Sequence, residues 1–236
     1  SLRMHNTAFE DEALYLSAGH HELAHLLYGV PLPNDYASYF SGSPVLYPIL
    51  GALADTWGGL AAARHLSLLA MLTTTALLYS LTRRLFNERV GLCAAVIFSV
   101  TESAIFLGNF ATYDAPALGL LAVAAWIVVR TASFRWPVYL LAAPVMALAV
   151  GTKYAALLFV PTIVVLAGLA AWPYRGRRAL IPPVALTIAV AGLLTGALAL
   201  AGPAYLAAVK STTTARAHGT TPVLVLLKDC LLYTSP

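Results

Sequence analysis

The sequence predicts an all-α fold, a multi-pass bundle of transmembrane helices. Sixty per cent of its 236 residues are hydrophobic and only 10% are charged, whereas a soluble domain carries about a quarter charged residues. Several runs approach the roughly 20 apolar residues that a helix needs to cross a bilayer. Basic residues fall in alternate connections between these runs. The net charge of +4 is therefore explained by loop topology, and no nucleic-acid partner is expected.

Residues 1–59 are expected to form an extracytoplasmic loop with two interfacial helices. Residues 11–28 fit the first helix, which an acid such as Asp11 would begin favourably. After the prolines of VPLPND, the stretch SPVLYPILGALADTWGG fits a second helix that Gly58 and Gly59 close. Both helices are too short to cross a bilayer, so we expect them to lie along its surface. Six aromatic residues are expected to anchor at the head groups, namely Tyr15, Tyr36, Tyr39, Tyr47, Trp57 and Trp136.

Residues 60–229 are expected to form a transmembrane bundle of about six helices. The apolar runs are 60–81, 90–107, 115–129, 137–152, 154–172 and 180–201. Arginines in the first, third and fifth connections mark these as cytoplasmic, which places residues 1–59 on the opposite side. Both ends look cut, so a fragment is expected, and residues 230–236 resemble a sequencing-adapter scar that does not belong to the fold.

Under this topology most acidic residues lie on the outer side, where we expect the functional site. A carboxylate at a membrane surface can act as a base when burial and neighbouring charges shift its pKa. Ionisable residues at membrane depth usually mark function or pairing. A pocket for an anionic head group is therefore predicted, and a structural ion pair such as Lys153 with Asp114 is the alternative. The candidate residues are Asp11, Glu12, Arg64, Glu102, Tyr113, Asp114 and Lys153.

A second pattern, His21-Glu22-Leu23-Ala24-His25, spells H-E-x-x-H. This pattern offers two imidazoles on one helix face to zinc, with the glutamate as base, and so gives the alternative of a membrane zinc metalloprotease. Catalytic zinc needs a third protein ligand, and no motif marks one. A further alternative, a non-enzymatic transporter-like protein, would need acids along a path through the bundle, and no charged residue in the middle of an apolar run supports it.

The order of these features resembles a known family. The motifs that carry the resemblance are the acidic pair Asp11-Glu12, YFSGSPVLYPILGALADTWGGLAAARHLSLL, TRRLFNER, FATYDAPAL and AVGTKYAALLFVP. They resemble the multi-pass C-type (GT-C) glycosyltransferases, the superfamily of protein O-mannosyltransferases and aminoarabinose transferases, especially the bacterial family 39-like members. The likeness covers most of residues 9–172, and it leads us to expect a bacterial protein of the cell membrane.

The resemblance implies an enzyme that moves a sugar from a polyprenyl-phosphate donor to an acceptor glycan, lipid or protein on the extracytoplasmic side of the membrane, with inversion at the anomeric carbon. Asp11 holds the place of the family's catalytic base, and Glu12 follows it. A base must deprotonate the acceptor hydroxyl while a cation stabilises the departing phosphate, and Lys153 or Arg64 is the candidate cation. Glu12 and Asp114 would shape the acceptor or donor site. No cofactor is certain, since some relatives use a divalent metal and others do not.

Overall fold

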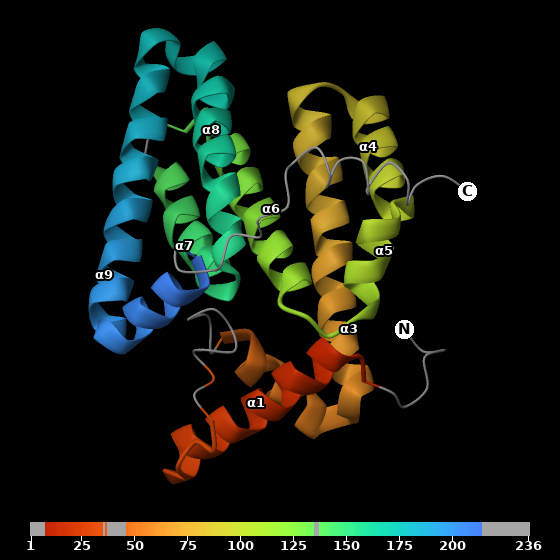
Figure 1. The fold of residues 1–236 in the computed structure, drawn as a ribbon. Coiled ribbons are helices and arrows are strands. Elements are labelled where there is room, and N and C mark those ends of the chain that lie inside the picture. The colour runs from red at the N-terminus through yellow and green to blue at the C-terminus, as the bar shows by residue number, and fades with distance from the viewer. Residues whose placement is uncertain (1–7, 35, 37–45, 135–136, 214–236) are drawn as a thin grey trace, which may run out of the picture.

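The structure is a computed structural model that describes residues 8–34, 36, 46–134 and 137–213, and these residues contain helices and no strand. Figure 1 shows a helical bundle with α1 lying across one end of it. The predicted all-α fold is thereby confirmed. The helices are α1 (Glu10–Tyr28), α3 (Leu46–Leu85), α4 (Glu88–Val100), α5 (Glu102–Asn109), α6 (Asp114–Arg130), α7 (Ala142–Thr152), α8 (Val160–Arg175) and α9 (Ile181–Thr213), with 3-10 turns η1 (Val138–Leu141), η2 (Tyr154–Phe159) and η3 (Gly176–Leu180).

Helix α1 matches the helix predicted over residues 11–28. It begins after Phe9, whose backbone N–H donates to the Glu12 carboxylate at 2.9 Å, and three acids in its first turn suit the N-terminal end of the helix dipole. It ends at Gly29, where a φ of 68° lets the chain leave the helix in the left-handed region that glycine adopts without strain. One face of α1 packs on α3, and the opposite face is exposed.

Helix α3 consists of two helical parts that meet at Gly58 and Gly59. Gly58 has φ −153° and Gly59 has φ 67°, so both depart from helical geometry. The break confirms that a short apolar helix ends at this glycine pair and that a separate long helix begins at residue 60. The long part runs to Leu85, four residues beyond the predicted end. Whether α1 and the short part of α3 lie on a membrane surface stays a prediction.

The helix predicted as continuous over residues 90–107 is broken. Helices α4 and α5 meet at an angle of 62°, and Thr101 between them has extended backbone geometry (φ −67°, ψ 130°). The hydroxyl of Thr101 donates to the carbonyl of Ile97, and that of Ser99 to the carbonyl of Val96. Such side-chain bonds compete with the helical ladder, which hydropathy alone does not reveal.

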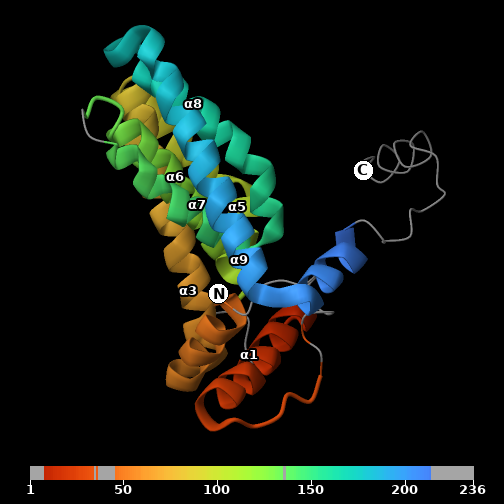
Figure 2. The same cartoon turned by 90° about the vertical axis from the view of Figure 1, so that its left-hand side faces the viewer.

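The remaining helices form a bundle that follows the predicted order. Figures 1 and 2 show that α3 to α4, α6 to α7 and α8 to α9 connect at the end of the bundle opposite α1. The described arginines that the sequence predicts to be cytoplasmic lie in or next to these connections, whereas Asp11 on α1 and Asp114 at the start of α6 lie near the other end. A core of small residues around Met146, which is fully buried, joins α6, α7, α8 and α9. The helix packing thus gathers the basic connections at one end, as the charge pattern predicted.

By length and apolar composition, two helical stretches of the described chain could each cross a membrane, Leu46–Leu85 and Tyr154–Pro203, and α4 with α5 would add a third if the bent pair is one span. The second stretch contains α8 and α9, which run along each other in opposite directions (Figure 1). The prediction of six crossings is not settled by these lengths and stays a prediction.

Candidate functional site

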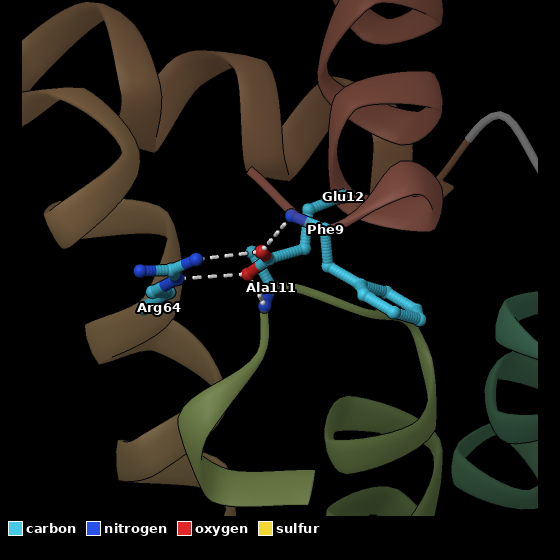
Figure 3. Close-up of polar contacts among 4 residues, drawn as sticks. All are labelled: Phe9, Glu12, Arg64 and Ala111. Carbon is cyan, nitrogen blue, oxygen red and sulfur yellow. Dashed lines mark hydrogen bonds and ion pairs between the residues drawn. The ribbon is translucent and has the colours of Figure 1, made fainter. Parts of the chain in front are cut away.

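A buried ion pair joins the start of α1 to α3. Figure 3 shows the Glu12 carboxylate between Arg64 and two backbone amides. Arg64 donates from Nε to Oε1 at 2.9 Å and from its Nη2 to Oε2 at 2.7 Å. The N–H of Ala111 donates to Oε1 at 2.6 Å and that of Phe9 to Oε2 at 2.9 Å. Glu12 is fully buried and Arg64 is 3% exposed, so this carboxylate ties α1, α3 and the loop after α5 together.

The environment of Glu12 favours its ionised form. Burial alone raises the pKa of a carboxyl group, but the hydrogen bonds from Arg64, Ala111 and Phe9 outweigh it and lower the pKa of Glu12 below its usual value. Because the folded-state pKa is lowered, the stability that Glu12 contributes is present at neutral pH and is lost as the pH falls through that pKa. Arg64 was expected near phosphate, but the structure places its guanidinium on Glu12.

Asp11 lies beside Glu12 in sequence and differs from it in environment. Successive helical residues point about 100° apart, and the Asp11 side chain is exposed while that of Glu12 is buried. The two acids of the pair can therefore have different roles. Glu12 holds the helix in place, and Asp11 is accessible to a substrate.

A second ion pair joins α6 to the end of α7. The ammonium group of Lys153 donates to Asp114 Oδ1, and both side chains are about one-third exposed. The Lys153 Nζ also lies 5.0 Å from the ring centroid of Tyr113, within the range of a cation–π contact. The sequence had offered this ion pair as the alternative to a substrate site. The pair exists, and its partial exposure leaves it accessible.

An apolar groove opens beside this ion pair. It has a volume of about 300 Å³ and is lined almost entirely by apolar atoms from both parts of α3, from α6 and from α7. Pro116 and Thr152 belong to its wall. Thr152 directly precedes Lys153 in the sequence, and Pro116 is two positions after Asp114. Tyr47 lines the groove from α3. The arrangement suits a ligand with an apolar chain and an anionic head.

Glu102, the remaining acidic candidate, is not brought into this group. It is exposed at the first residue of α5, and the whole of α5 separates it from the turn that carries Tyr113 and Asp114. Glu102 was expected to belong to the same outer site as Asp114 because residues 90–107 were predicted as one continuous helix and the bend at Thr101 was not foreseen.

The H-E-x-x-H residues have other partners in the structure. His21 Nδ1 lies 2.5 Å from the hydroxyl of Tyr36, and His25 Nδ1 lies 2.8 Å from the carbonyl oxygen of Val30. Glu22 is buried, with no partner for its Oε2 atom among the described residues, and burial raises its pKa to about 6. Across the described part of the chain, no group of three or more His, Cys, Asp or Glu side chains could hold a metal ion. The third ligand that a zinc protease needs is thus not provided by these residues.

Three aromatic residues expected at the head groups are buried instead. Tyr15, Tyr36 and Tyr47 are 7%, 7% and 1% exposed, whereas Trp57 is 90% exposed and fits an anchor. Tyr39 and Trp136 lie outside the described residues. The tyrosines are buried because α1 packs on α3 at this point. The amino-acid types alone did not indicate this packing. The signal for burial that the sequence did hold was helical spacing, because Tyr15 and Ala18, three positions apart, are both buried on one face of α1.

Comparison with known proteins agrees with this architecture. A family model described as dolichyl-phosphate-mannose-protein mannosyltransferase matches residues 48–213, which include Arg64, Asp114 and Lys153 but not α1. No curated protein and no solved structure gave a significant match. An enzyme family is not compatible with the transporter-like alternative. The chain therefore belongs to the dolichyl-phosphate-mannose-protein mannosyltransferase family and is a membrane glycosyltransferase of the mannosyltransferase type.

Proposed function

We propose that this enzyme takes its sugar from a polyprenyl-phosphate donor and transfers it to an acceptor on the extracytoplasmic side of the membrane. The observation that carries the proposal is the apolar groove beside the Asp114–Lys153 pair. A prenyl chain requires an apolar surface, and its phosphate requires a cation close to the end of that surface. The family's description names dolichyl-phosphate mannose, a compound of this class.

Lys153 is the cation that we assign to the donor phosphate. Its ammonium group is held by Asp114 and by the face of the Tyr113 ring, and it remains about 29% exposed. Arg64 is 3% exposed and already donates to both oxygens of Glu12. A phosphate that approached Arg64 would have to separate a buried ion pair, at a cost of several kcal/mol. Lys153 is paired with the partly solvated Asp114, so the donor phosphate would only have to replace Asp114 or share the ammonium group with it.

Asp11 is the residue to which we assign the role of base. Its exposed carboxylate would take the proton of an acceptor hydroxyl as that oxygen attacks the anomeric carbon of the sugar. The bond between this carbon and the phosphate oxygen breaks in the same step, and the lipid phosphate leaves with the electron pair. Lys153 stabilises the charge that develops on the leaving phosphate. Attack opposite the leaving group inverts the anomeric carbon, as the family resemblance implies.

A larger side chain in the groove should discriminate between donors by chain length. In Val123→Phe, a half-buried groove residue of α6 is enlarged. We expect the KM for a long-chain prenyl mannosyl phosphate to rise about four- to fifteenfold, since each displaced methylene costs about 0.8 kcal/mol. The KM for a short-chain donor should not change. Initial rates of mannose transfer in detergent would provide both values.

The matched control is Val165→Phe, because Val165 is an exposed valine of α8 that lines a different groove. This variant should behave as wild type with both donors. An equal effect of Val123→Phe on long and short donors, or no transfer from either donor by the wild type, would contradict the proposed donor.

The proposed sidedness is supported by the opposite placement of charge in the bundle. Asp11 lies at the end that α1 covers, and Arg84 lies near the α3–α4 connection at the other end (Figure 1). In a background without the two native cysteines, we expect a membrane-impermeant maleimide to label Asp11→Cys on intact cells. Arg84→Cys should be labelled only after permeabilisation. The reverse pattern would place the site in the cytoplasm.

A further inference from the structure

Tyr15 lies on α1, the helix that carries the proposed base Asp11. It contacts Tyr113, and the proposed cation Lys153 lies over the Tyr113 ring. Tyr15 follows Asp11 by four positions on α1, so the two residues share one face of the helix. Its side chain is 7% exposed. The Tyr15 ring lies 4.8 Å from the ring of Tyr113, centroid to centroid, with a tilt of 54°. This is a favourable distance for an aromatic pair.

Tyr15 is connected to Lys153 through Tyr113, which contacts both residues. The Lys153 ammonium lies over the Tyr113 ring at 5.0 Å from its centroid, and Lys153 pairs with Asp114. Tyr47 packs edge-on against Tyr15 at 6.1 Å and also lines the apolar groove. Tyr15 is therefore enclosed between the groove wall and the ring that supports the cation.

The electrostatic surroundings of Tyr15 favour its neutral phenol. Burial, the hydrogen bond with Tyr113, and the charges of Asp11 and Asp114 all raise the pKa of Tyr15 above its usual value. The phenol thus stays protonated at physiological pH and brings no negative charge close to the donor phosphate. The charges of both carboxylates act on this hydroxyl.

We infer that Tyr15 is a positioning residue, whose ring holds Tyr113 in place and thereby fixes the Lys153 ammonium at the position of the donor phosphate. The inference deepens the proposed function and rests on its assignment of Lys153 to the donor. It assigns to Tyr15 a role in donor binding that does not involve contact with the reacting atoms. Loss of the ring should release Tyr113 and then Lys153, whereas loss of the hydroxyl alone removes the hydrogen bond with Tyr113 but keeps the ring contact, so its effect should be smaller.

Two variants of Tyr15 separate the ring from the hydroxyl. Tyr15→Leu removes the aromatic pair, and we expect the KM for the prenyl mannosyl phosphate to rise about three- to tenfold, with the acceptor KM unchanged. Tyr15→Phe keeps the ring and should stay within about twofold of wild type for both substrates. The control is Tyr79→Leu, because Tyr79 lies near the other end of α3, beside Arg83 and Glu88. It should change neither KM.

A second measurement reports on Lys153 without catalysis. In the purified full chain, the rate of acetylation of Lys153 by an amine-reactive reagent is compared with that of the exposed Lys210 by mass spectrometry. We expect Tyr15→Leu to increase the Lys153 to Lys210 ratio about threefold or more, and Tyr15→Phe to leave it unchanged.

The two measurements distinguish the two proposals. If the wild type transfers no sugar from a prenyl phosphate but acetylation responds to Tyr15→Leu as expected, the proposed donor is wrong and the positioning contact stands. If transfer occurs and acetylation is unchanged, or donor and acceptor KM rise equally, the inference is overturned. Equal effects of Tyr15→Phe and Tyr15→Leu would also overturn it, because the ring would then not be responsible.

Discussion

Asp11→Asn is expected to fold, insert into the membrane and lose sugar transfer by a factor of about 10² to 10⁴, the usual contribution of a general base. Asn has nearly the same shape as Asp but cannot accept the proton of the acceptor hydroxyl. The Asp11 side chain is exposed, so the substitution disturbs no buried contact of α1. The measurement is the kcat of mannose transfer at saturating donor and acceptor, with the amount of purified protein as reference.

The matched control is Glu10→Gln, which removes a charge from the neighbouring exposed position in the same helical turn. Glu10→Gln should retain at least about half of the wild-type rate, since loss of one helix-terminal charge costs only about 0.3–1 kcal/mol of stability and removes no catalytic group. If Asp11→Asn keeps the rate of this control, the role of base belongs to another residue.

Glu12→Ala is expected to cause the largest loss of stability, about 3–5 kcal/mol in the free energy of unfolding, because Arg64 is left as an uncompensated buried charge. The substitution also removes the acceptor for the N–H groups of Phe9 and Ala111. α1 should then separate from α3 and from the loop before α6. Chemical unfolding in a mild detergent would measure the effect, and protease cleavage within α1 would locate it.

A double variant separates the charge from the packing. Glu12→Leu with Arg64→Leu removes both charges, so its stability should recover in part relative to Glu12→Ala. The control Glu10→Ala changes an exposed acid of the same turn and should cost less than about 1 kcal/mol. A loss for Glu12→Ala no greater than that of Glu10→Ala would show that the ion pair does not hold α1.

The helices were predictable from the sequence because their causes are local. Apolar runs, the turn at VPLPND and the glycine pair at 58–59 act over a few residues, and the structure has helices and a break where these signals lie. The bend at Thr101 was missed because the residues that accompany it, Ser99 and Thr101, are two hydroxyl side chains in a nearly apolar run. Hydropathy averages over such a pair.

The candidate site was only partly predictable, because its contacts depend on how distant segments pack. The sequence indicated the Lys153–Asp114 pair, because the predicted topology puts the start of one helix and the end of the next helix at the same face of the bundle. It did not indicate that Glu12 binds Arg64, 52 positions away, or that Tyr15 and Tyr47 are buried. Charge and aromatic character are visible in a sequence, but their burial follows from the docking of α1 on α3.

The attachment of Glu12 has a consequence for the energetics of the reaction. One carboxylate anchors α1 to α3 and to the loop that leads directly into Asp114. The segment that carries Asp11 and the segment that orients Lys153 are thereby preorganised as a unit before either substrate arrives. Little conformational entropy is then lost when the ternary complex forms, and more of the binding free energy remains to lower the barrier to transfer.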